Sequence, residues 1–165
     1  MYEYFPKEPK KQEMMILAGL LGSGFFLYGF SRIPDLPFPA LLQLFSVILM
    51  VGAVIVLTRY LLRDFCYRIE PREESDIPDF TVTEYCGKRI SVVCRISLND
   101  ITEVRPMTVK EARNLAKGQK SRRVYDYTCR INPENLYLLT VSAGEDTFDI
   151  RIIADKALTE FLLRR

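Results

Sequence analysis

The sequence predicts a membrane protein of the α+β class, with two apolar helices near the N-terminus and a β-rich domain after them. The first observation is an uncharged stretch of eighteen residues, Ala40–Leu57 (ALLQLFSVILMVGAVIVL). At ~1.5 Å per residue, a helix of this length spans roughly 27 Å, close to the thickness of a bilayer's hydrocarbon core. The second observation is a change of pattern at Asp64, where apolar runs give way to short segments that alternate polar and apolar residues.

The chain begins with a polar segment, residues 1–13, which contains three lysines and two prolines. We expect it to form a flexible cytoplasmic arm. Residues 14–30 (MMILAGLLGSGFFLYGF) follow without a charge and are long enough to cross a bilayer with some local thinning. A cleaved signal peptide is the alternative, because small residues occur at Gly22, Ser23 and Gly24. The apolar run continues well beyond that point, which favours a transmembrane helix.

Three prolines in the nine residues 31–39 predict a tight turn between two antiparallel helices. The second helix is expected at about residues 40–62, so the transmembrane hairpin occupies residues 14–63. Membrane helices pack through small residues that let their backbones approach. The sequence offers Ala18 with Gly22, or Gly19 with Ser23, on the first helix, and Ser46, Gly52 and Ala53 on the second.

Basic residues flank both ends of this hairpin, while its turn contains Arg32 alone. The positive-inside rule therefore predicts a cell-membrane protein with two spans and both termini in the cytoplasm. The cytoplasm keeps thiols reduced. All four cysteines belong to the following domain and none forms a CxxC pair, so we expect buried thiols, with a metal or redox site as the alternative.

Residues 64–165 predict seven short strands and a closing helix. Asp155 is a suitable N-cap for that helix, which presents an apolar stripe of Ala157, Leu158, Phe161 and Leu162. A turn-rich acidic linker is expected after the first strand, and a helix at 108–118 interrupts the strands. The expected strands are Phe65–Glu70, Phe80–Tyr85, Arg89–Ile96, Ile101–Arg105, Arg123–Ile131, Leu136–Val141 and Thr147–Ile153.

Two stretches of this domain, FTVTEYCGKRISVVCRISLNDITEV and LYLLTVSAGEDTFDIRIIADKALTEFLL, resemble bacterial pleckstrin-homology-like (PH-like) domains. The resemblance covers about residues 65–165, and small bacterial membrane proteins carry such domains after a membrane hairpin. It implies a seven-strand barrel or sandwich capped by the C-terminal helix. It also implies a binding or assembly module rather than an enzyme, and it supplies no ligand residues.

The strongest local charge feature is the basic segment 110–123, in which Glu111 is the only acid. In a domain tethered to the cytoplasmic leaflet, such a cluster can bind anionic lipid headgroups at ~1 kcal/mol per basic residue. The alternative is a solvated loop that balances the acidic run 70–84. The candidate lipid- or partner-binding residues are Lys110, Arg113, Lys117, Lys120, Arg122 and Arg123.

Several function classes are disfavoured. Basic and acidic residues are equal in number from Asp64 onward, which argues against nucleic-acid binding. Histidine is absent, and the sequence contains no phosphate loop, nucleophile elbow or metal-ligand spacing. We therefore expect no catalytic residues, metal or cofactor, and a membrane-anchored binding module whose partner is a protein, a second copy or lipid. The alternative is an accessory subunit of a larger membrane complex that assembles through the hairpin.

Overall fold

The computed structural model describes residues 2–6, 9–34, 36, 38–72, 75–112, 122–144 and 146–163. The chain forms two compact units. One is a helical unit, Pro9–Arg63, and the other is a domain built from Met1–Glu8 together with Asp64–Arg165. The helical unit is thus an insertion between two segments of the same domain.

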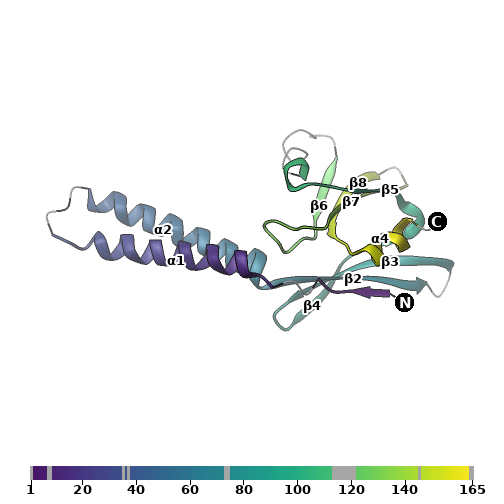
Figure 1. Cartoon of the computed structure of the whole chain (residues 1–165), viewed down its shortest axis with the longest axis horizontal. Coiled ribbons are helices and arrows are strands. Elements are labelled where there is room, and N and C mark those ends of the chain that lie inside the picture. Colours follow the sequence, from purple (N-terminus) through teal and green to yellow (C-terminus); the bar gives the residue numbers. More distant parts are fainter. Residues whose placement is uncertain are drawn as a thin grey trace. The chain divides into compact units, whose positions relative to one another are not determined.

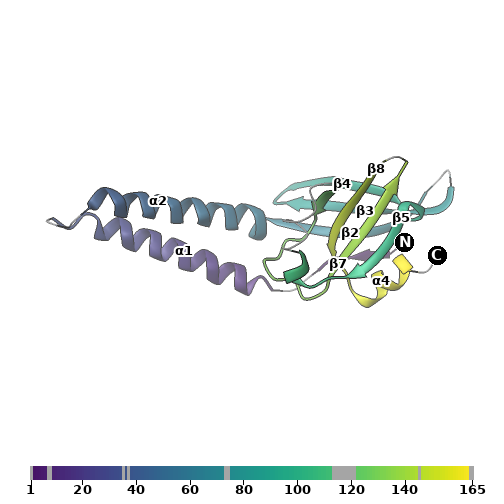
Figure 2. The ribbon, with the colours of Figure 1, turned by 90° about the horizontal axis from the view of Figure 1, so that it is seen from above.

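The helical unit is an antiparallel pair of long helices, α1 (Lys11–Phe30) and α2 (Pro39–Val56) (Figures 1 and 2). A five-residue π-helical turn, Leu57–Leu61, extends α2. Both helices are long and apolar enough to cross a membrane by length and composition. The observed bounds agree with the predicted helices except at the start of α1, which begins three residues earlier than expected.

The two helices approach at small residues, as membrane helices do. Ser46 Oγ on α2 donates a 2.8 Å hydrogen bond to the carbonyl of Gly24 on α1, and Ser46, Ala53 and Gly24 are all buried. The predicted contribution of Gly22 or Gly19 is wrong, because neither has an atom of another residue near the place of a side chain. Gly22 lies two residues from Gly24, or about 200° around the helix, and so faces away from α2.

The first sheet has the strand order β1-β2-β3-β4. Its strands are β1 (Tyr2–Tyr4), β2 (Arg63–Arg72), β3 (Ser75–Cys86) and β4 (Arg89–Ser97). β1 pairs antiparallel with β2, with Tyr4 opposite Tyr67. The predicted flexible arm is therefore wrong for its first residues, which pair with a strand more than sixty residues away in the sequence.

The acidic linker predicted after the first strand is also wrong. β2 extends to Arg72 and β3 begins at Ser75, so most of that stretch is strand, in spite of Pro71 and Pro78. β3 and β4 meet at a two-residue turn in which Gly87 has a φ of +59°. A glycine adopts this conformation without the steric strain that a side chain would add.

The second sheet has the order β5-β7-β8-β6, in which β6 runs parallel to β8 and the other pairs are antiparallel. A 3-10 turn, Leu98–Asp100, leads from β4 into this sheet. A short helix at 109–112 lies between β5 and β6, and the rest of the helix predicted at 108–118 lies outside the described residues. The strands are β5 (Ile101–Pro106), β6 (Arg123–Asp126), β7 (Leu136–Ala143) and β8 (Asp146–Ile153).

The described residues form two separate sheets of four strands each, together with helix α4 (Lys156–Leu163). Of the predicted seven-strand barrel or sandwich, the closed barrel is therefore wrong, and the two sheets correspond to the sandwich. In the described part of the chain, each sheet forms its own ladder and no strand pairs across them. The 3-10 turn stands in the chain between β4, an edge strand of the first sheet, and β5, which pairs with β7 in the second. The domain is nevertheless of the predicted α+β class.

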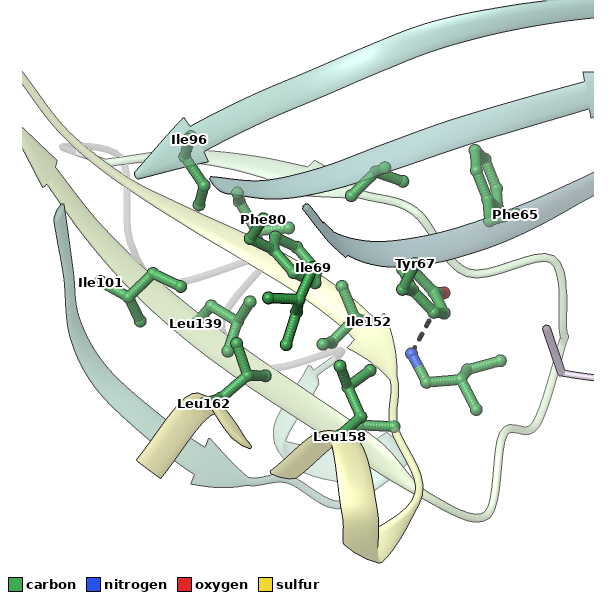
Figure 3. Close-up of a cluster of buried hydrophobic side chains, with 14 of the residues drawn as sticks. Phe65, Tyr67, Ile69, Phe80, Ile96, Ile101, Leu139, Ile152, Leu158 and Leu162 are labelled. Carbon is green, nitrogen blue, oxygen red and sulfur yellow. Dashed lines mark hydrogen bonds between the residues drawn. The ribbon is translucent and has the colours of Figure 1, made fainter. Parts of the chain in front are cut away.

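The core lies between the inner faces of both sheets and α4 (Figure 3). Asp155 caps α4 as predicted, since its carboxylate accepts a 2.7 Å bond from the backbone N–H of Leu158. Leu158 and Leu162 are buried, whereas Phe161 is 47% exposed, which corrects the predicted four-residue apolar stripe. The other large core side chains include Phe65, Tyr67, Ile69, Phe80, Ile96, Ile101, Leu139 and Ile152.

Candidate functional site

The structure describes half of the predicted basic site. Lys110 lies in the short helix at 109–112, Arg122 directly precedes β6, and Arg123 is the first residue of β6; all three side chains are exposed. Arg113, Lys117 and Lys120 lie outside the described residues. The three described cations therefore lie at the two ends of the basic segment 110–123.

The single acid of this segment is engaged at the start of the short helix. Glu111 Oε2 accepts hydrogen bonds from the backbone N–H and the hydroxyl of Thr108, at 2.8 and 2.9 Å. Thr108 Oγ1 in turn accepts from the Glu111 N–H at 3.3 Å, which completes a capping box. The two bonds from Thr108 lower the pKa of Glu111, and the nearby Arg105 adds to this effect. Glu111 is thus a helix cap, and not a dedicated partner of the basic side chains.

Two acids of the 70–84 run have basic partners within their own sheet. Asp79 is buried and accepts a 2.9 Å bond from Arg95 Nε on the neighbouring strand. Glu70 lies 4.0 Å from the guanidinium of Arg68. Glu73 and Glu74 lie outside the described residues. The alternative in which this acidic run balances the basic segment therefore gains no support from Asp79 or Glu70.

On one face of β1, an acidic side chain is hydrogen-bonded to a cysteine and an arginine of β2. Glu3 Oε1 accepts a bond of 2.9 Å from Arg68 Nη2 and one of 3.2 Å from the Cys66 thiol. Burial, followed by the Glu3 bond, raises the pKa of Cys66 to about 11. Since a thiolate is the reactive form of cysteine, Cys66 is chemically inert at neutral pH.

On its other face, the same strand contacts the closing helix. Tyr2 OH donates to both carboxylate oxygens of Asp155 at 2.9 Å, and its ring lies 5.0 Å from that of Phe161. Tyr4 stacks on Tyr67 at 6.3 Å. Burial and the Asp155 bond raise the pKa of Tyr2 to about 12. Both ends of the chain thus meet within one domain.

All four cysteines are described, and all are free thiols. Cys66 and Cys129 are buried as predicted, Cys94 is partly buried, and Cys86 is exposed at the β3–β4 turn, which the prediction of buried thiols missed. Within the described ranges, no three histidine, cysteine, aspartate or glutamate side chains are grouped so that they could hold a metal ion.

The helical unit carries an apolar groove that sequence reasoning did not find. It has a volume of about 500 Å³ and lies between the end of α1 and one face of α2. Two of its lining residues carry a hydroxyl, and both hydroxyls are hydrogen-bonded: that of Ser46 donates to the Gly24 carbonyl, and that of Tyr28 accepts a bond from Arg32. The sequence feature that could have indicated this groove is the spacing of apolar residues four positions apart along α2. The lining residues are Phe25, Tyr28, Ser46, Val47, Met50, Val51, Val54 and Ile55.

Near the C-terminal end of each helix, an arginine lies against a tyrosine. Arg32 Nη2 donates a 2.7 Å bond to Tyr28 OH, and the Arg32 guanidinium lies 5.2 Å from the centre of the Tyr28 ring. The Arg59 guanidinium lies 5.8 Å from the ring of Tyr60 at the end of the second helix. At the opposite end of the helical unit from the Ser31–Pro39 turn, Lys10 Nζ donates to the carbonyls of Leu61 and Arg63, at 3.2 and 2.8 Å.

Comparison with protein-family models, with curated proteins and with solved structures finds no match to this chain.

Proposed function

We propose that this protein is a membrane-anchored, non-enzymatic binding module that presents a PH-like domain to the cytoplasm. The observation that carries the proposal is the insertion of two long apolar helices between β1 and β2, two paired strands of one domain. The helices serve as the anchor, and the domain serves as the binding part.

Three features of the helical unit support the anchor. The outward faces of both helices are apolar, with exposed side chains such as Phe26, Leu44 and Ile48. Tyrosine and arginine pairs occur at the helix ends, where such side chains occupy the interface between lipid and water. Charged groups are confined to the ends of both helices.

The strand pairing supports an even number of spans. β1 can pair with β2 only if residues 2–4 and 63–72 lie on the same side of the membrane. The Lys10 bonds to Leu61 and Arg63 hold the two ends of the hairpin together on that side. The basic flanks predict that this side is the cytoplasm.

The basic segment is the proposed contact for lipid headgroups or a protein partner. Lys110, Arg122 and Arg123 are exposed, and Glu111 is held by Thr108. Asp79, an acid of the 70–84 run, is bonded to Arg95. These observations leave the cations available to anionic headgroups or to an acidic partner.

A photo-crosslinking side chain introduced in place of Arg122 in the full-length protein tests this binding function. In native membranes, it is expected to yield an adduct with anionic lipid or with one protein, and the yield should fall as salt rises, since the attraction is screened over ~8 Å at physiological ionic strength. Ala143, exposed beside the β7–β8 turn, is the matched control site. Equal yields at both sites would contradict the binding role.

The groove favours a second candidate function, that of an accessory subunit that assembles through the hairpin. It offers a partner helix an apolar recess with no competing hydrogen bonds. The same crosslinker at Val51, which lines the groove, separates the two functions. An adduct with a membrane protein at Val51 and none at Arg122 indicates the subunit, and the reverse indicates the binding module.

A further inference from the structure

The tip of the β3–β4 hairpin exposes both apolar and basic side chains within a few residues of the turn. Ile90 is 66% and Val92 62% exposed, and they pair with Tyr85 and Thr83, so they lie on the face of the sheet away from the core. The ring of Tyr85 meets that of Phe5 edge to face, with centroids 5.7 Å apart. We define the tip surface as Phe5, Tyr85, Lys88, Arg89, Ile90 and Val92.

Chain connectivity places this surface at one particular end of the domain. Phe5 directly follows β1, and α1 begins at Lys11, so at most ~20 Å of extended chain separates them. β2 starts at Arg63, where the helical unit ends. The contact between Phe5 and Tyr85 therefore brings the β3–β4 turn to the end of the domain at which the chain enters the helical unit.

The chemistry of the tip surface fits the headgroup layer of an anionic bilayer. Ile90 and Val92 are large apolar side chains that water solvates poorly, and Lys88 and Arg89, which directly precede Ile90 in the chain, are exposed cations at the same turn. Glu84 is the acid nearest to the turn on either strand, and its side chain is partly buried. Attraction of cations to anionic lipid decays within a Debye length, ~8 Å at physiological salt, so only a surface close to the membrane benefits.

We propose that the tip surface inserts into the headgroup layer of the bilayer that holds the helices. Ile90 and Val92 reach the acyl boundary, and Lys88 and Arg89 bind anionic phosphates. This inference rests on the proposed membrane anchor and adds a second, peripheral contact to it. The domain is thereby held in one orientation on the membrane.

The exposed thiol of Cys86, within the turn, offers a natural probe site. The full-length protein with Cys94 replaced by serine is labelled at Cys86 with an environment-sensitive fluorophore and reconstituted in vesicles. In vesicles that contain phosphatidylglycerol, we expect quenching by spin-labelled lipid and protection from aqueous iodide. In vesicles of phosphatidylcholine alone, both effects should be weaker.

Two double variants and a matched control test the residues. Replacement of Lys88 and Arg89 by glutamine should lower the ratio of inserted to free tips by roughly 25-fold, if each cation contributes about fivefold. Replacement of Ile90 and Val92 by serine should also expose the label to iodide. Leu163→Ser removes an apolar side chain that is equally exposed on α4 and should change nothing.

The outcomes separate this inference from the proposed anchor. If the protein fails to float with vesicles after an alkaline wash, the anchor itself is wrong. If it floats but iodide reaches the label equally in anionic and neutral vesicles, the tip inference alone is overturned. If protection of the Cys86 label from iodide depends on protein concentration in detergent, a second copy of the chain covers the tip. This result also overturns the lipid contact.

Discussion

At the scale of single residues, Tyr67 places a hydrogen-bonded hydroxyl inside the core. Its side chain is fully buried, yet its hydroxyl donates a 2.7 Å bond to the carbonyl of Tyr127. The same hydroxyl accepts a 3.3 Å bond from the N–H of Ile153, drawn as the dashed line in Figure 3. A buried backbone group that loses its partner costs ~1–3 kcal/mol. Tyr67 thereby joins β2 to two segments of the other half of the domain.

Tyr67→Phe should therefore lower the free energy of unfolding by roughly 1–3 kcal/mol, measured by chemical unfolding of the full chain with near-ultraviolet circular dichroism. Tyr125→Phe, at a side chain 40% exposed, is the matched control and should change stability by less than about 0.5 kcal/mol. Equal losses in the two variants would contradict the buried bond pair.

The same residue predicts a pH dependence. Burial raises the pKa of Tyr67 far above the ordinary value of 10.0. Above pH 10 the unfolded chain therefore loses the phenolic proton while the folded chain keeps it, so stability declines as pH rises. Tyr67→Phe should flatten this decline between pH 10 and 11. An unchanged slope would contradict the assignment.

At the scale of elements, β1 is the feature that the sequence failed to predict. Three residues are too few to produce a periodic signal. The strand with which they pair comes after both helices in the sequence. The alternation of Tyr2 and Tyr4 about Glu3 was the only local sign. The acidic linker failed for a related reason, since Pro71 and Pro78 favour turns locally while pairing between β2 and β3 overrides that preference.

Removal of Tyr2–Phe5 should expose the Cys66 thiol, which β1 now covers through Glu3. In the shortened chain, maleimide labelling located by mass spectrometry should find Cys66 modified many times faster than in the full chain. Cys129 is also buried, and its thiol donates to Asp64 at 3.8 Å, so it is the internal control. Continued protection of Cys66 would show that β1 does not cover that face.

Helix α4 allows a second test at this scale. Leu158→Ala should cost about 2–5 kcal/mol of stability, because its side chain is fully buried in the core. Phe161→Ala removes a larger side chain but one that is half-exposed, so it should cost clearly less than Leu158→Ala. Thermal unfolding of the two variants decides the order, and the reverse order would mean that α4 is rotated about its axis.

The helical unit offers a matched pair of glycines. A methyl group at Gly24 would meet Met50 at 3.4 Å, whereas one at Gly22 meets nothing within 4 Å. Gly24→Val should therefore destabilise the helix pair by roughly 1–3 kcal/mol, as overpacking does, and Gly22→Val should not. Unfolding by SDS in mixed micelles measures both. A larger effect at Gly22 would indicate that the helices pack on the other face.

At the scale of the whole molecule, local signals in the sequence predicted the types of element but not the way distant segments pair. The two helices, the α+β class and the Asp155 cap follow from uncharged runs, alternation and a capping residue, which are local signals. The division into two sheets and the inclusion of β1 depend on contacts between distant segments, which no local pattern encodes. Half of the candidate basic site, Lys110, Arg122 and Arg123, is described as exposed, and its ligand stays a prediction.

The central claim is that the helices form a membrane hairpin inserted into a single cytoplasmic domain. A reporter enzyme that is active only outside the cytoplasm tests it most directly, fused after Arg165 in one protein and inserted into the turn at residues 31–39 in another. We expect no activity from the first fusion and full activity from the second, because the strand pairing keeps both ends of the chain on one side. Activity after Arg165, or silence in the turn, would contradict the account.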